Sequence, residues 1–565
     1  MKRAALAAAC VIGLTLVLGY GLAPPAARTV VPDSTPGAQP PRGAMHVHSR
    51  RSDGSGTPAE IAAAARRAGL RFVVLTDHGD ATRMPERPQY LDDVLLIDAV
   101  EISSDGGHVV ALGLPRAPYP LAGEPRDVVE DIARLGGMSI AAHPGSAKPE
   151  LAWRDWTAPV DGVEWLNGDS EWRDESSSVL ARTLLTYMFR QPESLAALLD
   201  RPEPVLARWD DQARVRRVVG LAAGDAHARL GLSEAGEQST GPASLLEIPA
   251  YEQIFRTFSI SLPGIVFSGD AAADARAVVD AIRRGRVFSS IDALASPAWL
   301  SFSAESGVSR ADMGDEVAAG GLRRFLASIA GPPDAELTLF KDGVPIATAT
   351  GGTLAHDDDR AGVYRVEVQL PESPGTPPVP WIVSNPIFVR DATPEQSPPP
   401  VPLGQASTAY DDGEAKDWRV ERSARSEGAL DVLLALPGRQ LRLRYALGGT
   451  LSESPYVAAV MPAGAEVSNY LALRFTAYAA QPMRISVQLR APRGGDGDRW
   501  RRSVYLDETP REITVRFDDM RRVSDASPER PALADVRDVL FVVDTVNTAP
   551  GGTGQVWLDR ISYVR

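Results

Sequence analysis

Apolar and polar positions follow two alternating spacings through the first half of the chain. Residues 57–69 (TPAEIAAAARRAG) have helical spacing, with Thr57 and Glu60 set for a capping box and Gly69 set to end the helix. The apolar run 71–76 (RFVVLT) follows and predicts a buried strand. The same helix–strand pair recurs at 127–143 and at 273–291. Repeated pairs of this kind predict a parallel sheet or barrel.

The spacing changes after Pro297. Short runs with a period of two, separated by Gly, Pro and Asp, predict a small β-sandwich over residues 301–392. Residues 393–405 are a Pro-rich linker, and residues 406–565 again read as strands, which fits a jelly-roll-like sandwich. The predicted fold class is therefore α/β over residues 43–300, followed by two all-β sandwich domains.

The N-terminus has the pattern of a targeting segment. Lys2 and Arg3 precede an apolar run over residues 4–23, which is about the length that a bilayer-spanning helix needs. We expect residues 1–28 to be a signal peptide or an N-terminal membrane anchor, and residues 29–42 to be a linker. The protein is then exported, periplasmic or extracellular, and bound to the membrane if the segment is not cleaved.

Composition narrows the class of function. The 565 residues are 44% hydrophobic and 23% charged, which is typical of globular domains, and the net charge is -14. Such a chain lacks the broad positive field of nucleic-acid binders, so no nucleic acid is expected as a partner. The only cysteine, Cys10, lies in the apolar run, which excludes an internal disulfide and a cysteine-based zinc site.

Candidate chemistry is concentrated in the histidines. Six of the seven lie between residues 46 and 227, each in a short motif with acidic or glycine neighbours. His46 and His48 are two apart in a predicted strand, so both rings can reach one metal ion. The candidate metal ligands are His46, His48, Asp53, His78, Glu101, His108, His143, Asp225 and His227.

The positions of these residues matter as much as their types. His78, Glu101, His143 and the pair Asp225 and His227 all follow apolar runs. Functional residues of parallel barrels gather where strands end, so one edge could collect them all. Any one of these histidines alone is more often structural than a ligand. It is the ordered set that favours two or three metal ions.

In that order, HVHSRRSDG, TDHGD, EISSDGGH, AHPG and GDAH resemble the metal-binding motifs of the polymerase and histidinol phosphatase (PHP) family over residues 43–300. The resemblance implies a distorted (β/α)7 barrel with two or three divalent ions, zinc, manganese or iron. It also implies the grouping of ligands. His46, His48, Glu101 and Asp225 would hold one ion; Glu101 would bridge to a second held by His108 and His143; and Asp53, His78 and His227 would hold a third.

Other segments suggest a subtype. GVEWLNGDSEW, YRVEVQL and WIVSNPIFV are similar to a secreted, carbaryl-hydrolase-like branch of the family with an appended β-sandwich. Some relatives in that branch hydrolyse carbamates or esters. The ending VWLDRISYV is similar to galactose-binding-like or carbohydrate-binding sandwiches. The resemblance thus adds a carbohydrate or cell-surface ligand as a candidate partner of the C-terminal domain.

Further residues receive candidate roles. Glu101 and Asp225 are assigned to catalysis through the ions, and Asp77 either orients an imidazole, assists proton transfer or caps a helix. Arg229 and Asn167 are candidates for binding a small-molecule substrate, with a surface position as the alternative. His356 is expected in an acidic surface loop, outside the constellation.

Three functions remain open at this point. The first is an exported phosphoesterase in which the ions generate a hydroxide nucleophile, so that no serine or cysteine is required. The second is carbamate, ester or amide hydrolysis on the same centre. The third is a binding scaffold without catalysis, which the complete ligand set disfavours.

Overall fold

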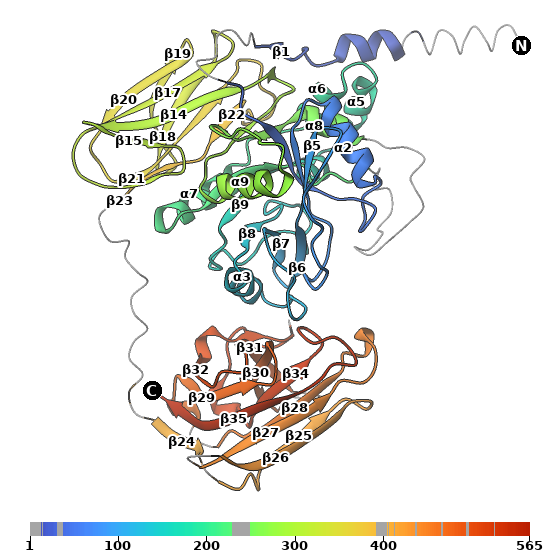
Figure 1. Ribbon diagram of the computed structural model, residues 1–565, viewed down its shortest axis with the longest axis vertical. Helices are drawn as coiled ribbons and strands as arrows, with labels where there is room; N and C mark the ends of the chain where they lie inside the picture. Colours follow the sequence, from blue (N-terminus) through green and yellow to red (C-terminus); the bar gives the residue numbers. More distant parts are fainter. Residues whose placement is uncertain are drawn as a thin grey trace, which may run out of the picture. The chain divides into compact units, whose positions relative to one another are not determined.

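The computed structural model (Figure 1) describes residues 13, 15–30, 38–228, 249–390, 404, 406–411, 413–435, 438–464, 467–492, 497–524 and 526–565. The chain forms two compact units. Unit 1 comprises Met1–Pro115 and Val129–Gln396, and unit 2 comprises Arg116–Val128 and Ser397–Arg565. Within the described residues, none of the helices has both the length and the apolar character needed to span a bilayer.

The three predicted helices of the α/β region are confirmed. Helix α2 (Pro58–Arg67) begins with the capping box of Thr57 and Glu60. Helix α3 spans Pro125–Arg134 and α9 spans Ala271–Arg283. The apolar side of α9 packs into a core that it shares with strands of both sheets described below. The remaining helices are α4 (Gly168–Arg173), α5 (Ser177–Tyr187), α6 (Gln191–Ala196), α7 (Glu203–Val215) and α8 (Tyr251–Thr257).

One sheet of unit 1 contains three adjacent parallel strands. These are β2 (Arg42–Val47), β3 (Phe72–Leu75) and β5 (Val94–Asp98), in the spatial order β2–β3–β5. The neighbouring pairings are antiparallel, with β4 (Gln89–Leu91) beside β5 and β11 (Ser259–Ser261) between β2 and β12 (Phe288–Ser290).

A second sheet has the order β10–β9–β8–β7–β6. Strands β8 (Met138–Ala141), β9 (Gly162–Asn167) and β10 (Val219–Ala223) are parallel. Strands β7 (Gly107–Leu112) and β6 (Val100–Ser104) run antiparallel to their neighbours. The expectation of an all-parallel sheet is therefore wrong for β4, β6, β7, β11 and β12, and the α/β region is mixed.

The two sheets meet at two seams. At one, Val47 bridges Ala226, and the His48 N–H donates to the Ala226 carbonyl at 3.0 Å. At the other, His78 bridges Glu101, and the Gly79 N–H donates to the Glu101 carbonyl at 3.0 Å. Both seams contain candidate metal ligands, so the ends of β2, β3 and β10 and the start of β6 converge on one place.

Ten further strands complete unit 1 as a β-rich region. They are β14 (Trp299–Ser306), β15 (Ser309–Asp312), β16 (Glu316–Ala318), β17 (Arg323–Ala330), β18 (Glu336–Lys341), β19 (Val344–Thr350), β20 (Thr353–Asp358), β21 (Gly362–Gln369), β22 (Ile382–Ser384) and β23 (Ile387–Arg390). Strand β22 pairs with β12, so part of the β-rich region continues a sheet of the α/β region. His356 lies in strand β20, paired with Phe325, and its expected loop position is wrong.

A buried charge network joins α7 to β21. The guanidinium of Arg365 donates two bonds of 2.9 Å to the carboxylate of Asp210 and also contacts Glu367. Arg201 donates to Glu367 at 2.8 Å. Arg365 is only 1% exposed, so its partners compensate a charge that is removed from water.

Unit 2 is a β-sandwich. One sheet has the order β26–β27–β35–β29–β32 with β24 beside β35, and the other has the order β25–β28–β34–β30–β31–β33. A shared core of Leu443, Phe475, Val487, Phe541 and others fills the space between the two sheets. The strands are β24 (Ala406–Tyr410), β25 (Arg419–Arg422), β26 (Glu427–Ala435), β27 (Gly438–Ala446), β28 (Tyr456–Pro462), β29 (Ala472–Ala479), β30 (Met483–Ala491), β31 (Asp498–Leu506), β32 (Arg511–Arg516), β33 (Arg521–Arg522), β34 (Asp538–Asp544) and β35 (Thr553–Val564).

The predicted N-terminal tether is partly built into unit 1. Strand β1 (Arg28–Thr29) pairs in parallel with β13 (Ala295–Ser296), and Val30 is buried in the core of the β-rich region. Residues 31–37 of the predicted linker, and most of the linker 393–405, lie outside the described residues.

Candidate metal centre

The structure brings all nine predicted ligands together in unit 1. His46 and His48 lie in and just after β2, His78 just after β3, and His143 just after β8. Asp225 and His227 follow β10, while Asp53 lies in the loop after β2. Glu101 and His108 differ in placement, because they lie on the antiparallel pair β6 and β7 rather than beyond parallel strands.

Glu101 lies at the centre of the cluster and is 1% exposed. Its Oε1 is 2.8 Å from His108 Nδ1 and 2.8 Å from His143 Nε2. Its Oε2 is 3.1 Å from His46 Nε2, 3.2 Å from His48 Nε2 and 3.3 Å from His78 Nδ1. The two carboxylate oxygens therefore face different sets of imidazoles, which is the arrangement that a carboxylate bridging two cations requires.

Asp225 completes the set around His46 and His48. Its Oδ1 is 3.4 Å from His46 Nε2 and 3.2 Å from His48 Nε2. Two imidazole nitrogens and two carboxylate oxygens thus point into one space, which is a donor set suited to zinc, manganese or iron. The sets of donor atoms within 4.8 Å of one another differ from the group predicted for the first ion: His46 and His48 lie with Glu101, whereas Asp225 lies with His46 and His143.

Asp53 collects a further group at the half-buried edge of the cluster. Its Oδ2 is 3.0 Å from His227 Nε2 and 3.7 Å from His78 Nε2, and its Oδ1 is 3.4 Å from His48 Nδ1. His48 therefore contacts two groups, through Nε2 on one side and Nδ1 on the other. The structure joins His48 to the predicted set of Asp53, His78 and His227.

Unpartnered nitrogens supply an independent test of whether these residues fit metal ions. His48 Nε2 and His78 Nδ1 are buried without a hydrogen bond among the described residues. A buried nitrogen in that state is costly unless another ligand reaches it. Four subsets of the nine residues have donor atoms within 4.8 Å of one another, which is close enough for a shared ion.

Local backbone strain coincides with the site. His46 has φ of 59°, His143 of 30° and Asp225 of 46°, all in the left-handed region that residues with a side chain seldom adopt. The β2–β3 register shifts between Ala44 and Val47, so His46 lies at an irregularity in the strand. Gly54 is required in the adjacent loop, because a Cβ there would be 2.2 Å from the His48 carbonyl oxygen. Strain of this kind clusters at functional sites.

Charge balance within the cluster comes from carboxylate–imidazole pairs. Burial acts to lower the pKa of His48, but the nearby carboxylates of Asp225 and Glu101 outweigh it and raise that pKa to about 10. Burial acts to raise the pKa of Glu101, and the surrounding imidazoles, His46 first, hold it well below its ordinary value. Protons and cations therefore compete for the same nitrogen atoms.

Glu164 is a functional candidate that sequence analysis missed. It lies in β9, and its Oε1 is 2.6 Å from His46 Nδ1. Its Oε2 accepts from the His143 N–H at 2.7 Å and from the Asn167 amide at 2.9 Å. Glu164 therefore holds His46 by the nitrogen that faces away from Glu101. The available signal was one acid inside the otherwise apolar run GVEWL.

The remaining predicted residues have the following positions. Asp77 accepts from Ser49 N–H at 2.7 Å and from Ser52 Oγ at 2.9 Å, so it fixes the loop between His48 and Asp53. No helix begins at Asp77 in the described segment 38–228, and the alternative of a helix cap is wrong. Asn167 is 4% exposed and caps α4, accepting from Ser170 N–H at 3.1 Å. Arg229 lies outside the described residues.

Comparisons with known proteins do not assign the chain to a family. No family model matches the chain. A stretch of 140 residues is 28% identical to an uncharacterized protein of Methanocaldococcus jannaschii, covering 22% of this chain and 80% of that protein.

Among solved structures, the family 11 carbohydrate-binding module of a cellulosomal cellulase of Clostridium thermocellum is 19% identical and has a TM-score of 0.24. It covers 28% of this chain and 94% of the module. The family 30 module of another cellulosomal cellulase of that organism is 10% identical, with a TM-score of 0.22, and covers 28% of this chain and 96% of the module. TM-scores of this size do not establish a shared fold.

Proposed function

We propose that the chain is an exported hydrolase of the PHP type, with a phosphoester as the bond cleaved. The observation that carries the proposal is Glu101, whose two oxygens face two different sets of imidazoles. The two seams between the sheets support a distorted barrel with these residues at one end. The natural substrate is taken to be a small molecule.

The candidate ligands fall into three groups, one for each proposed ion. His46, His48, Glu101 and Asp225 would hold one ion, Glu101 with His108 and His143 a second, and Asp53, His78 and His227 a third. Divalent cations in such a centre acidify water and neutralise negative charge on the substrate. The chain's own contribution is to fix the donors. Glu164 orients His46, and Asp77 holds the loop that carries Asp53.

The test is a pair of isosteric changes at the centre of the cluster. Glu101→Gln and Asp225→Asn each remove a negative charge between imidazoles without changing side-chain volume. We expect both to lose bound metal and to lower turnover by orders of magnitude, while circular dichroism stays unchanged. His356→Ala on β20 is the matched control, because it removes an imidazole outside the cluster.

Two outcomes would reject the proposal. Full metal content and wild-type activity in Glu101→Gln would remove the bridging role. If elemental analysis found no transition metal in the wild-type protein, the hydrolase itself would be excluded and the scaffold function would take its place. A panel of phosphoesters, carboxylesters, amides and carbamates separates the phosphoesterase from the alternative hydrolase on the same centre.

A second candidate function concerns unit 2, and one aromatic pair favours it. Tyr478 and Trp557 stack with ring centroids 4.7 Å apart on the outer face of β29 and β35, where neighbouring Val556 and Leu558 point into the core. Tyr478 Oη donates to Gln440 at 3.1 Å. Aromatic rings beside amide groups suit a carbohydrate. Trp557→Ala should abolish retardation in gels containing soluble polysaccharide, and Val523→Ala should not.

A further inference from the structure

The last part of the predicted membrane run is packed against the rest of unit 1. Residues 15–22 are helical, and within this helix Gly19 is buried. A Cβ at Gly19 would be 2.5 Å from the Phe189 ring and 3.2 Å from the Leu185 carbonyl oxygen. The rings of Tyr20 and Phe189 meet edge to face at 6.2 Å. Gly19 therefore permits a close approach that a larger residue would prevent.

The residues after this helix are held against the rest of unit 1 by hydrogen bonds. Arg190 donates to the Pro24 carbonyl, and Ala27 N–H donates to Glu193 Oε1 at 3.2 Å. Arg28 N–H donates to the Leu294 carbonyl at 2.9 Å, and the Arg28 guanidinium donates to Asp334 at 2.6 Å. We call residues 24–30 the strap.

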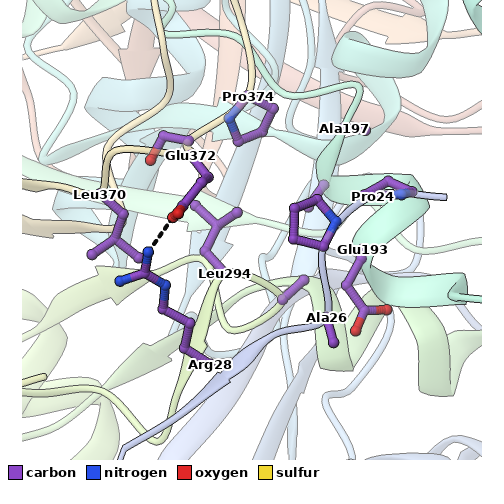
Figure 2. A pocket seen from close by; sticks show the side chains of 13 residues that line it. Pro24, Ala26, Arg28, Glu193, Ala197, Leu294, Leu370, Glu372 and Pro374 are labelled. Carbon is purple, nitrogen blue, oxygen red and sulfur yellow. Dashed lines mark hydrogen bonds and ion pairs between the residues drawn. The ribbon is translucent and has the colours of Figure 1, made fainter. Parts of the chain in front are cut away.

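Figure 2 shows how the strap lies against unit 1. Pro24, Ala26 and Arg28 line a pocket of about 90 Å³ together with Glu193 of α6, which lies beside Ala26, and Glu372. Arg28 reaches across to Glu372, with which it forms an ion pair. Because the strap is anchored by backbone pairing and by two ion pairs, it is part of the fold and not a free linker.

The helix and α5 together expose an apolar face. Val17 is 70% and Tyr20 is 67% exposed on the helix, while Leu184 is 43% and Met188 is 69% exposed on the α5 side. Leu184 and Met188 are four residues apart, next to the Leu185 and Phe189 pair that contacts Gly19. We call Leu16, Val17, Leu18, Tyr20, Leu22, Leu184 and Met188 the N-terminal apolar face.

We infer that the N-terminal apolar face is seated in a lipid bilayer, so that the mature protein keeps residues 15–30 and is held on the membrane in one fixed orientation. This occupant follows from the continuity of the chain. Residues 4–14, which lead directly into the face, are almost wholly apolar and are preceded by Lys2 and Arg3. Because the strap is short, the N-terminal apolar face can move little relative to the rest of unit 1.

In the alternative arrangement, the N-terminal segment tethers the protein to the membrane and the N-terminal apolar face does not contact the bilayer. A flexible tether would leave the side chains of Leu184 and Met188 in water, even with the apolar run inserted in the bilayer. A seated face places both in the bilayer interface, where apolar side chains beside an anchoring segment add to membrane binding. The two arrangements therefore differ in the environment of residue 188 and not in whether the protein binds membranes.

The experiment uses the full chain in vesicles of phosphatidylethanolamine and phosphatidylglycerol. With Cys10→Ser as background, a fluorophore is attached at Met188→Cys or, as the matched control, at Val308→Cys on a distant exposed turn. Quenchers carried by the lipids should quench the label at 188 several-fold more strongly than the label at 308. Soluble iodide should show the opposite preference.

Gly19→Leu supplies the decisive second variant, because the added side chain collides with Phe189 while the apolar run is kept. We expect it to float with vesicles as before but to lose the lipid quenching at 188. Equal lipid quenching at 188 and 308 in the parent protein would overturn the inference. A mature N-terminus located after residue 30 by sequencing would do so as well. Neither result depends on metal content or turnover.

Discussion

At the residue scale, Glu171 of α4 is an acid held in its neutral form. It is 7% exposed, and burial raises its pKa to about 8, helped by the nearby carboxylates of Asp174 and Asp200. The folded protein therefore binds this proton more tightly than the unfolded chain does. The associated stability is present below about pH 4.5, its ordinary pKa, and is lost as the pH rises through about 8.

Glu171→Gln should remove this dependence. Its amide oxygen can still accept the bond that Asp200 N–H donates to Glu171 at 2.9 Å. We expect the variant to match the wild type near pH 4.5 and to be more stable by at least ~1.4 kcal/mol above pH 8, which corresponds to one pKa unit. Urea unfolding at both pH values measures the difference. A variant that is less stable than the wild type at high pH would contradict the assignment.

Glu164 belongs to the same scale, and its expected effect is on metal affinity. Glu164→Gln places an amide N–H where the carboxylate accepts from His143 N–H or from the His46 ring. Metal affinity should fall by about 10- to 100-fold, as for other carboxylates that orient a ligand. Saturating metal should restore turnover, whereas a purely structural defect would not be rescued. Titration calorimetry with the metal-free protein gives the affinity directly.

Single residues also show what the sequence can predict. The nine candidate ligands could be found because histidines and acids stood together in short motifs. Glu164 was missed, because a lone acid in an apolar strand forms no motif and its partners lie far away in sequence. The positive φ of His46 could not be predicted either, because no residue type in the sequence indicates it. Asp77 was found, but its serine partners were not.

At the scale of elements, the sequence predicted an element correctly where all of its local signals were present. The capping box of α2 was predictable from Thr57 and Glu60 alone. The antiparallel pair β6 and β7 was missed, although Asp105 and Gly106 form a hairpin-turn signal between Ser104 and Gly107, which pair. The segment was read only as a metal motif. The pairing of β12 with β22 joins residues so distant that no local pattern could show it.

The cap of α2 is itself testable. Thr57 Oγ1 accepts from the Glu60 N–H at 3.3 Å, and Glu60 accepts from the Thr57 N–H at 2.8 Å. Thr57→Ala removes the first bond and should lower the stability of unit 1 by about 1 kcal/mol. Thr57→Ser keeps the hydroxyl and should restore most of the loss. Equal unfolding midpoints for the alanine variant and the wild type would show that the cap contributes nothing.

At the scale of the whole molecule, all nine candidate ligands lie in unit 1. An ion that binds only the folded state stabilises it by mass action, by about 4 kcal/mol at a thousand times its dissociation constant. A chelator should therefore lower the melting temperature of unit 1 and leave that of unit 2 unchanged. Calorimetry measures both transitions, and the destabilised variant Thr57→Ala identifies the one that belongs to unit 1. Parallel shifts in both units would contradict this placement.

The pairing of β12 with β22 and the Arg365 network also bear on how such a protein can evolve. A recombination event that removed the strands after β13 would expose the edge of β12 and leave the carboxylate of Asp210 buried without its guanidinium. Lineages that gain or lose domains should therefore break the gene after Arg390 and not near residue 300. We therefore expect the β-rich region over residues 299–390 to be inherited together with residues 42–290, which hold the candidate ligands.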